Sequence, residues 1–346
     1  MSERVVLAYS GDPDASAAVA RLAADAEVVA VTVDLGQGGE NLAAVRRRAL
    51  ESGATEALVV DARDEFAEQH CLPALQAHAL QAGRCPLVAE LARPLVARHL
   101  VVAAERFGAD AAAHGCAGDD TLAADLAALA PHLTVLAPVR DRRAGTGAAR
   151  CALRQNVWGR VAEPGVPRDL WRAPDWPLDP EELTITFDRG VPVALDGETV
   201  TVRQALQELN RRAGAHGVGH QDGPGAHCAT PGATTLTAAH QALEELTLAR
   251  DLAGFKRTVG HRWRGLVLDG TWSSPLRDAL DAFVADAQQQ VSGEVRVVLH
   301  AGRVAVRDRR AEEPWRAADL PAWYDSSERG PHRPCGRARA ATLARH

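Results

Sequence analysis

The sequence predicts a doubly wound parallel sheet of the α/β class, followed by a second domain of the α+β class. Over residues 1–150, short and continuously apolar runs alternate with amphipathic stretches, as in parallel sheets covered by helices on both faces. The first apolar run leads through a tight polar loop into a helical pattern. Residues beyond 180 favour strand hairpins and long helices instead.

In the first domain, the predicted strands are short runs of apolar residues, and the predicted helices have apolar side chains at helical spacing. The predicted strands are Val5–Tyr9, Val28–Val33, Ala57–Val60, Ala111–His114 and Thr134–Ala137. The predicted helices are Ala15–Ala24, Asn41–Ser52, Asp64–Gln81 and Leu87–Phe107. Right-handed crossovers between such strands place a ligand site at their carboxyl ends.

Residues 141–182 are rich in turns, proline and tryptophan, and we expect an extended connecting segment held on the surface by its tryptophans, Trp158, Trp171 and Trp176. After it we expect a hairpin that turns near Arg189-Gly190, and a helix that ends at Gly214. Long helices are expected over 234–263 and 274–291, and a second hairpin at Ala301-Gly302. The predicted division is therefore a first domain over 1–150, a second over 151–310 and a basic tail over 311–346.

The composition excludes several classes of protein. The chain is 46% hydrophobic and 24% charged, which allows a large core and excludes a disordered chain. Its net charge of -6 gives no general attraction to nucleic acid or anionic membranes, and we interpret the basic tail as solvated. We find no apolar run of membrane-spanning length, no secretory pattern and no C-x-x-C pair. We therefore expect a cytoplasmic protein without a metal site.

The loop Ser10-Gly11-Asp12-Pro13-Asp14-Ala15-Ser16 carries the first candidate chemistry. A strand, a tight loop and a helix start direct free backbone N–H groups and the helix dipole toward one point, which favours an anion such as phosphate. The alternative is an ordinary turn in which Asp14 or Ser16 caps the helix. These residues alone leave both interpretations open.

A resemblance to a known family favours the first interpretation. The stretch A-Y-S-G-D-P-D-A-S is similar to the S-G-G-x-D-[ST]-[ST] loop of the PP-loop ATP-pyrophosphatases, and more narrowly to the argininosuccinate synthase family. Further blocks resemble that family in order, over about residues 4–310. They are VTVDLGQGGENLAAVRRRALESGA, PALQAHALQAGRCPLVAELARPLVARHLV, ADAAAHGCAG, QNVWGR, FDRGVPVALDGE, HGVG, TPGATTL, FKR and WSSPLRDALDAF.

The resemblance implies a Rossmann-like, PP-loop nucleotide-binding domain and a synthetase domain. It also implies ATP and Mg²⁺ as cofactors, amino-acid-like substrates and a homo-oligomer, either a tetramer or a dimer. In the family's reaction, ATP adenylates the ureido oxygen of citrulline, and the amine of aspartate then displaces AMP. We name no catalytic side chain and no metal ligand from the sequence.

Two groups of positions follow from the resemblance. The cofactor positions are Ala8, Ser10, Gly11, Asp12, Asp14, Ser16, Val33, His114, Gly115 and Gly118. The substrate positions are Cys85, Glu90, Arg93, Ala117, Asp119 and Asp120. For His114 the alternative is a structural histidine, and for Glu90 with Asp119 it is a solvated acidic surface or a site for a cation. A further alternative is that Cys85 and Cys116 form a thiol pair.

The sequence departs from the family at these same positions. Asp12 replaces a glycine and puts a carboxylate beside a polyanion, a repulsion of about 1 to 4 kcal/mol at contact distance unless a metal ion bridges the two. If that glycine needs a positive φ, Asp12 also adds strain. Pro13 replaces a leucine and removes one N–H group, and Ala15 removes a hydroxyl.

The expected contacts to citrulline are lost as well. Cys85 and Cys228 stand where the family has tyrosines, and Glu90, Ala152 and Val161 stand where it has serines. Three hypotheses follow. The first is a ligase of the same type that acts on another substrate. The second is a non-catalytic homologue kept for binding or assembly, and the third is an ordinary argininosuccinate synthase.

Overall fold

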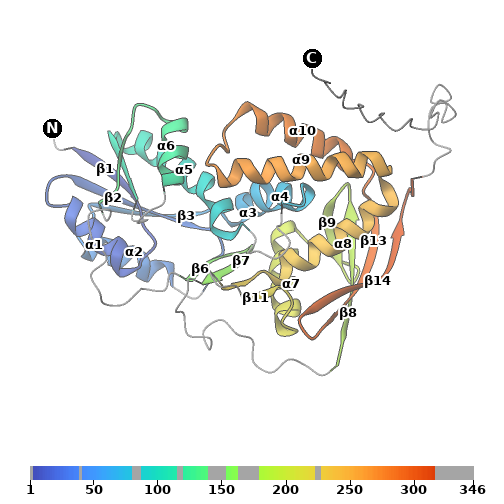
Figure 1. Ribbon diagram of the computed structural model, residues 1–346. Coiled ribbons are helices and arrows are strands. Elements are labelled where there is room, and N and C mark those ends of the chain that lie inside the picture. Colours follow the sequence, from blue (N-terminus) through green and yellow to red (C-terminus); the bar gives the residue numbers. More distant parts are fainter. Residues whose placement is uncertain are drawn as a thin grey trace, which may run out of the picture.

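A computed structural model describes residues 3–38, 41–79, 87–114, 120–138, 153–162, 179–222 and 227–315 (Figure 1). The described part of the first half is a five-stranded parallel sheet in the order β3-β2-β1-β4-β5. Its strands are β1 (Arg4–Ala8), β2 (Glu27–Asp34), β3 (Glu56–Asp61), β4 (Ala111–His114) and β5 (Thr134–Leu136). The predicted doubly wound sheet is confirmed, with strand ends shifted by at most one residue.

Strand β1 lies in the middle of this sheet because it pairs with β2 on one side and with β4 on the other. Its Val5, Val6 and Leu7 are buried, which explains why this run is continuously apolar. The strand order reverses between β1 and β4. A ligand site in such a sheet lies at this point, outside the carboxyl ends of the strands.

The helices of this half follow the predicted pattern with two exceptions: the helix over Asp120–Leu129 is not among the predicted ones, and one predicted helix contains a π-helical turn. They are α1 (Pro13–Leu22), α2 (Leu42–Glu51), α3 (Arg63–Phe66), α4 (Leu72–Gln76), α5 (Val88–Phe107) and α6 (Asp120–Leu129). The predicted helix over Asp64–Gln81 is confirmed as a continuous helical run, but it ends at Gln76, and a wide π-helical turn, η1 (Ala67–Cys71), lies between α3 and α4. Pro73 follows this turn and has no N–H group for the helical ladder.

The second half contains antiparallel sheets. One has the strand order β10-β9-β8-β13-β14 and the other β11-β12-β7-β6. The strands are β6 (Leu153–Asn156), β7 (Gly159–Ala162), β8 (Glu181–Asp188), β9 (Val191–Leu195), β10 (Glu198–Thr199), β11 (His220–Asp222), β12 (His227–Ala229), β13 (Gly293–His300) and β14 (Arg303–Ala311). The predicted hairpin turns at Arg189-Gly190 and Ala301-Gly302 are confirmed. All four residues have positive φ, which suits the twist of tight hairpins.

The prediction of an extended surface segment over 141–182 is wrong for its described middle part. Residues 153–162 form the β6–β7 hairpin, and Trp158 at its turn is only 1% exposed. The Asn156 side chain holds this turn, because its Oδ1 accepts from the Trp158 N–H at 2.9 Å and its Nδ2 donates to the Val88 carbonyl at 2.7 Å. Trp171 and Trp176 lie outside the described residues.

The helices of the second half are α7 (Val202–Ala215), α8 (Pro231–Thr247), α9 (Arg250–Leu268) and α10 (Pro275–Gln288). The predicted helix over 234–263 is two helices, because Leu248 and Ala249 adopt extended backbone angles between α8 and α9. Helix α9 contacts α5, and α10 contacts α4, so these two helices join the halves of the molecule (Figure 1). No helix in the described ranges is both long and apolar enough to cross a bilayer.

A network of buried polar side chains connects the turn after α4 to helices α8, α9 and α10. It consists of His78, His240, Glu244, Lys256 and Gln288, and Lys256 is the only lysine of the chain. Nζ of Lys256 lies 2.9 Å from Oε1 of Glu244 and 3.5 Å from Nδ1 of His78. Nε2 of His78 lies 2.8 Å from Nδ1 of His240, and Nε2 of His240 lies 2.8 Å from Oε1 of Gln288. The Gln288 amide closes the ring by donating to Oε1 of Glu244 at 2.7 Å.

The donors and acceptors of this ring fix the protonation states of its two histidines. Glu244 as a carboxylate only accepts, so Gln288 gives it an N–H and keeps its own oxygen for the Nε2–H of His240. His240 then accepts at Nδ1 from His78, and His78 accepts at Nδ1 from Lys256. Both imidazoles are therefore neutral. Burial lowers the pKa of His78 well below its usual value and that of His240 to about 4.

Removing the ammonium group should strongly destabilise the fold. In Lys256→Met, the buried Glu244 carboxylate loses its cation, and we expect a loss of about 3 to 5 kcal/mol in the free energy of unfolding. The double variant Glu244→Gln/Lys256→Met should cost less than the single variant, because no buried charge remains. Urea unfolding at pH 7 measures both. Arg262→Met, which removes an exposed cation from the same helix, is the control; an equal loss there would contradict the role of the pair.

The network also predicts how stability depends on pH. The unfolded histidines bind protons near pH 6.5, whereas folded His240 stays neutral down to about pH 4. Stability is therefore complete above pH 6.5 and should fall as the pH drops from 6.5 toward 4. Urea unfolding between pH 7.5 and 5 should show this slope, and His240→Gln should flatten it. The same slope in wild type and variant would rule out His240 as its source.

Candidate functional site

Three of the predicted cofactor positions lie together at the carboxyl edge of the parallel sheet. Ala8 ends β1 and is in register with His114, which ends β4. On the other side Ala8 is in register with Val31 of β2, and Val33 lies two residues further along that strand. Val33 and His114 are both buried. These three residues therefore border the space above the end of β1.

The loop after β1 has the close backbone approach that an anion site needs. Gly11 is buried and has a φ of +84°, which favours glycine there. A methyl group on Gly11 would lie 2.9 Å from Nη2 of Arg48, a residue of α2. The loop therefore packs directly beneath a guanidinium group. Sequence reasoning missed Arg48, because it is one of three successive arginines on a helix and gives no signal of its own.

Asp12, and not Asp14 or Ser16, caps helix α1. Its Oδ1 accepts from the Ala15 N–H at 2.7 Å, and its Oδ2 accepts from the Ser10 hydroxyl at 2.6 Å. Pro13 is the first helical residue, where its missing N–H costs nothing. The expectation that Asp12 adds backbone strain is wrong, because its φ is -74° and the positive φ belongs to Gly11.

The cap changes the electrostatics of the loop. The carboxylate of Asp12 occupies the helix N-terminus, where backbone N–H groups and the dipole attract an anion. The Ser16 hydroxyl is also engaged, 2.8 Å from the hydroxyl of the buried Tyr9. Asp14 lies in the first turn of the helix and adds a second carboxylate there. A phosphate group at this point has to compete with Asp12 for the same donors.

The loop after β2 supports the same edge through its backbone. Gln37 folds back on it, accepting from the Leu35 N–H at 2.7 Å and donating to the Val33 carbonyl at 2.7 Å. Asp34 accepts from the Gly36 N–H, and its Oδ2 lies 3.4 Å from Nε of Arg63. Arg63 also donates to the neighbouring Asp61, and this hydrogen bond lowers the pKa of Asp61 to about 2. These groups shape the edge of the site.

The β6–β7 hairpin joins this loop. The Val157 N–H donates to the Leu35 carbonyl at 2.9 Å, and Gly36, with a φ of +81°, leaves room for Val157. The Q-N-V-W-G-R block thus places the second half of the chain against the carboxyl edge of the parallel sheet. Its asparagine and tryptophan have structural roles in this contact.

The structure describes only part of the predicted substrate positions. Glu90 and Arg93 lie one turn apart at the start of α5, with Nη2 of Arg93 3.7 Å from Oε1 of Glu90. Asp120 is the first residue of α6. The remaining substrate positions, Cys85, Ala117 and Asp119, lie outside the described residues. The cofactor positions Gly115 and Gly118 lie outside them as well.

Two of the residues that replace polar family positions are neighbours. Val161 of β7 is in register with Cys228 of β12. Cys228 is buried and Val161 is half-buried. Where the family pattern has a serine and a tyrosine, this ladder therefore offers a thiol and an isopropyl group, which provide no comparable hydrogen-bonding surface.

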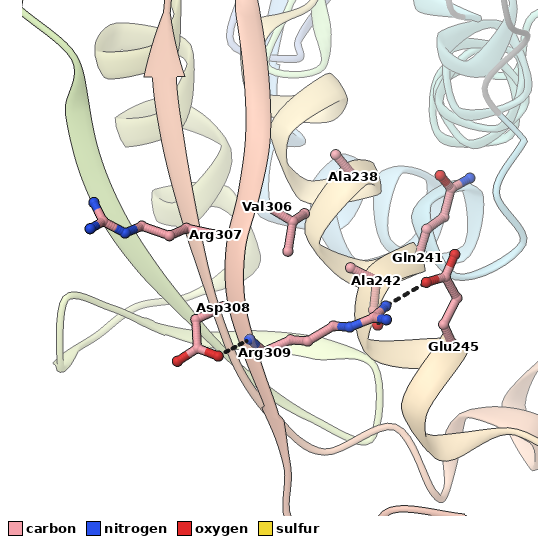
Figure 2. A pocket seen from close by; sticks show the side chains of 8 residues that line it. All are labelled: Ala238, Gln241, Ala242, Glu245, Val306, Arg307, Asp308 and Arg309. Carbon is pink, nitrogen blue, oxygen red and sulfur yellow. Dashed lines mark hydrogen bonds and ion pairs between the residues drawn. The ribbon is translucent and has the colours of Figure 1, made fainter.

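Two other places, a surface hollow and a cluster of buried polar side chains, carry no assigned site. A hollow of about 580 Å³ lies between α8 and the edge strand β14, and Figure 2 shows that Arg309 crosses it to Glu245. Arg309 also donates to the Ala242 carbonyl at 2.9 Å, so its guanidinium is already engaged. His78, His240 and Glu244 lie close enough together to hold a metal ion, but the ammonium group of Lys256 already supplies the positive charge among them.

Two family models match the chain. The model described as "Arginosuccinate synthase N-terminal HUP domain" matches residues 4–152. The model described as "Arginosuccinate synthase C-terminal domain" matches residues 152–330. The first match contains the parallel sheet and the loop after β1, and the second contains the antiparallel sheets and α7 to α10.

The cap predicts a graded response to substitution at Asp12. Asp12→Ala should lower the free energy of unfolding by about 1 kcal/mol, because the Ala15 N–H loses its acceptor. Asp12→Asn should cost much less, since asparagine also caps helices. Urea unfolding measures both variants, with Asp14→Ala as the control for charge in the first turn. An equal cost for the alanine and asparagine variants would contradict the capping role.

Proposed function

The chain belongs to the argininosuccinate synthase family, and on that premise we propose that it is an ATP-dependent ligase that joins carbon to nitrogen, with a substrate other than citrulline. In the first step, a ureido or carbonyl oxygen of the substrate attacks the α-phosphorus of ATP, and pyrophosphate leaves. In the second, an amine attacks the activated carbon, and AMP leaves with that oxygen. The protein's part in such a reaction is positioning and charge neutralisation.

The observation that carries this proposal is the loop after β1. It follows the central strand of the sheet, turns at a glycine with a positive φ and packs beneath Arg48. In our proposal Gly11 lets the backbone approach the phosphates, Ser10 donates to them and Arg48 offsets their charge. Ala8, Val33 and His114 border the nucleotide at the sheet edge. A turn that served only to start a helix would need neither the buried glycine nor the guanidinium above it.

The residues present fit ATP only if the charge of Asp12 is offset. Its carboxylate holds the donors that a phosphate group would use. We therefore propose that Mg²⁺ accompanies the nucleotide and that Asp12 is one of its contacts, which turns a repulsive carboxylate into an oxygen ligand that this hard cation prefers. Ser10 and the first-turn N–H groups are then released to the phosphates.

The proposed substrate is amino-acid-like but less polar than citrulline at its recognised end. The support is the ladder where Val161 faces Cys228, together with Glu90 in place of a family serine. Glu90 and Arg93 offer one charge of each sign at the start of α5. We also propose, from family membership, a cytoplasmic homo-oligomer, either a tetramer or a dimer. Its proposed domains are 1–150 and 151–310, followed by the tail 311–346.

One observation favours a second candidate function. Because Asp12 satisfies the helix N-terminus internally, the loop is complete without a ligand. A homologue that has lost catalysis and kept the fold for binding or assembly would have such a loop. The two candidates differ in whether ATP binds at all.

Calorimetry of the purified protein with ATP tests the proposal. We expect micromolar binding in the presence of Mg²⁺ and binding at least tenfold weaker without it. Asp12→Gly should reduce this dependence on Mg²⁺, since the repulsion of about 1 to 4 kcal/mol disappears. Ser10→Ala and Arg48→Gln should weaken binding, whereas Arg47→Gln, an exposed neighbour on the same helix, should leave it unchanged.

Pyrophosphate release with a panel of amino acids then tests the choice of substrate. We expect no turnover with citrulline and aspartate, and turnover with a less polar acceptor. Turnover with citrulline would refute the proposed substrate, although the ligase would stand. Absence of ATP binding in both the wild type and Asp12→Gly at millimolar ATP would refute the ligase and favour the non-catalytic homologue.

A further inference from the structure

A second cavity lies where the two halves of the chain meet. Its volume is about 260 Å³. The lining residues come from η1, α5 and α6 on one side and from the segment before and in α10 on the other: Gln69, His70, Pro94, Leu95, Arg98, Leu129, Trp272, Ser273 and Arg277. None of them is among the cofactor or substrate positions discussed above. Cavities between domains are frequent places for small ligands.

A stack of planar groups forms one wall of this cavity. The imidazole of His70 lies on the indole of Trp272, with ring centroids 4.6 Å apart and 7° between the planes. On Trp272 also lies the guanidinium of Arg277, 3.6 Å from the ring centroid. The stack spans from η1 to α10, and it holds Arg277 in a fixed position. The wall is therefore preformed.

The polar part of the lining suits an anion. Arg98 and Arg277 bring two positive charges, Gln69 and Ser273 bring further donors, and no carboxylate is among the lining residues. The side chain of Arg98 is 58% exposed, and its Nη1 pairs at 2.7 Å with Oε1 of Glu65, which lies outside the lining. Asp281 pairs with Nη2 of Arg277 at 2.9 Å, but the buried Nε of Arg277 has no hydrogen-bond partner among the described residues. This Nε has almost no accessible surface, so a ligand in the cavity would have to meet Arg277 through its terminal nitrogens.

His70 lines the cavity as a neutral imidazole. The pKa of His70 is lowered to about 3, first by burial and then by the charges of Arg277 and Arg98. The lining also has an apolar part, which consists of Pro94, Leu95 and Leu129. A ligand that satisfies both parts has one anionic group and a short hydrocarbon portion.

We propose that this cavity binds a small aliphatic carboxylate, whose oxygens accept from Arg277 and Arg98 and whose chain packs on Leu95 and Leu129. The volume suits a ligand of a few non-hydrogen atoms. Because the site joins residues of the two matched family domains, a bound carboxylate stabilises their contact. The site does not depend on ATP binding at the loop after β1.

Calorimetry of the full chain with sodium butyrate tests this proposal, with sodium chloride keeping the ionic strength constant. We expect millimolar or tighter binding of butyrate and no binding of butyramide, its neutral isostere. Arg98→Gln should weaken binding about tenfold, because a charge-assisted hydrogen bond is lost. Leu129→Trp should abolish binding by filling the rim, where Leu129 is 39% exposed and a larger side chain does not disturb the core.

Arg106→Gln is the matched control, because it removes an exposed arginine from the other end of α5. It should bind butyrate as the wild type does. Equal binding of butyrate and butyramide, or binding that neither Arg98→Gln nor Leu129→Trp changes, would overturn the proposal. So would absence of butyrate binding, whether or not inorganic phosphate binds in its place. Because no step uses ATP, failure here leaves the proposed ligase untouched.

Discussion

The backbone pairing of β1 is the constraint on which the rest of the site depends. Because β1 hydrogen-bonds to β2 and β4 along its length, the chain has to leave at the carboxyl edge of the sheet, from its middle strand. It then starts α1 within a few residues, and the first N–H groups of that helix have no partners in the helix itself. Any sequence that folds this way must supply an acceptor at that point, either from its own side chains or from a ligand.

This chain supplies the acceptor itself, and the consequence reaches beyond the loop. The same carboxyl edge carries the turn after β2, and that turn receives the β6–β7 hairpin through the Val157 N–H. Asn156 in turn fixes the hairpin to the start of α5. The second half of the chain is therefore positioned from the same edge. The ring of polar groups around Lys256 and the stack on Trp272 then hold α8 to α10 against the first half.

Most of the fold could be predicted from the sequence because its signals are local. Continuous apolar runs indicated the parallel strands, and Arg189-Gly190 and Ala301-Gly302 indicated tight hairpins. The failures came where distant residues decide. Trp158 is buried because the hairpin meets the turn after β2 and α5, which no local pattern reveals. The π-helical turn before Pro73 and the break between α8 and α9 likewise depend on what those helices pack against.

The candidate site was predictable in its position but not in its electrostatics. The loop could be found from residues 10–16, but the sequence could not show which carboxylate caps the helix. Nor could it show that Arg48 lies above Gly11, since one arginine in a run of three has the same local pattern as its neighbours. The lone lysine was visible in the composition, yet its ring of partners comes from segments more than 160 residues apart.

Asp12 combines two effects that a glycine at this position would separate. As a cap, its carboxylate stabilises α1 and orders the loop without any ligand. As a charge, it would make the proposed phosphate binding depend on a cation, because the same N–H groups cannot serve both anions. A glycine leaves the N–H groups at the helix N-terminus without an acceptor, so the loop is then ordered by the bound nucleotide. Under the proposed function, the exchange of glycine for aspartate therefore trades affinity for bare nucleotide against stability of the empty loop, and it makes the metal ion part of the recognition.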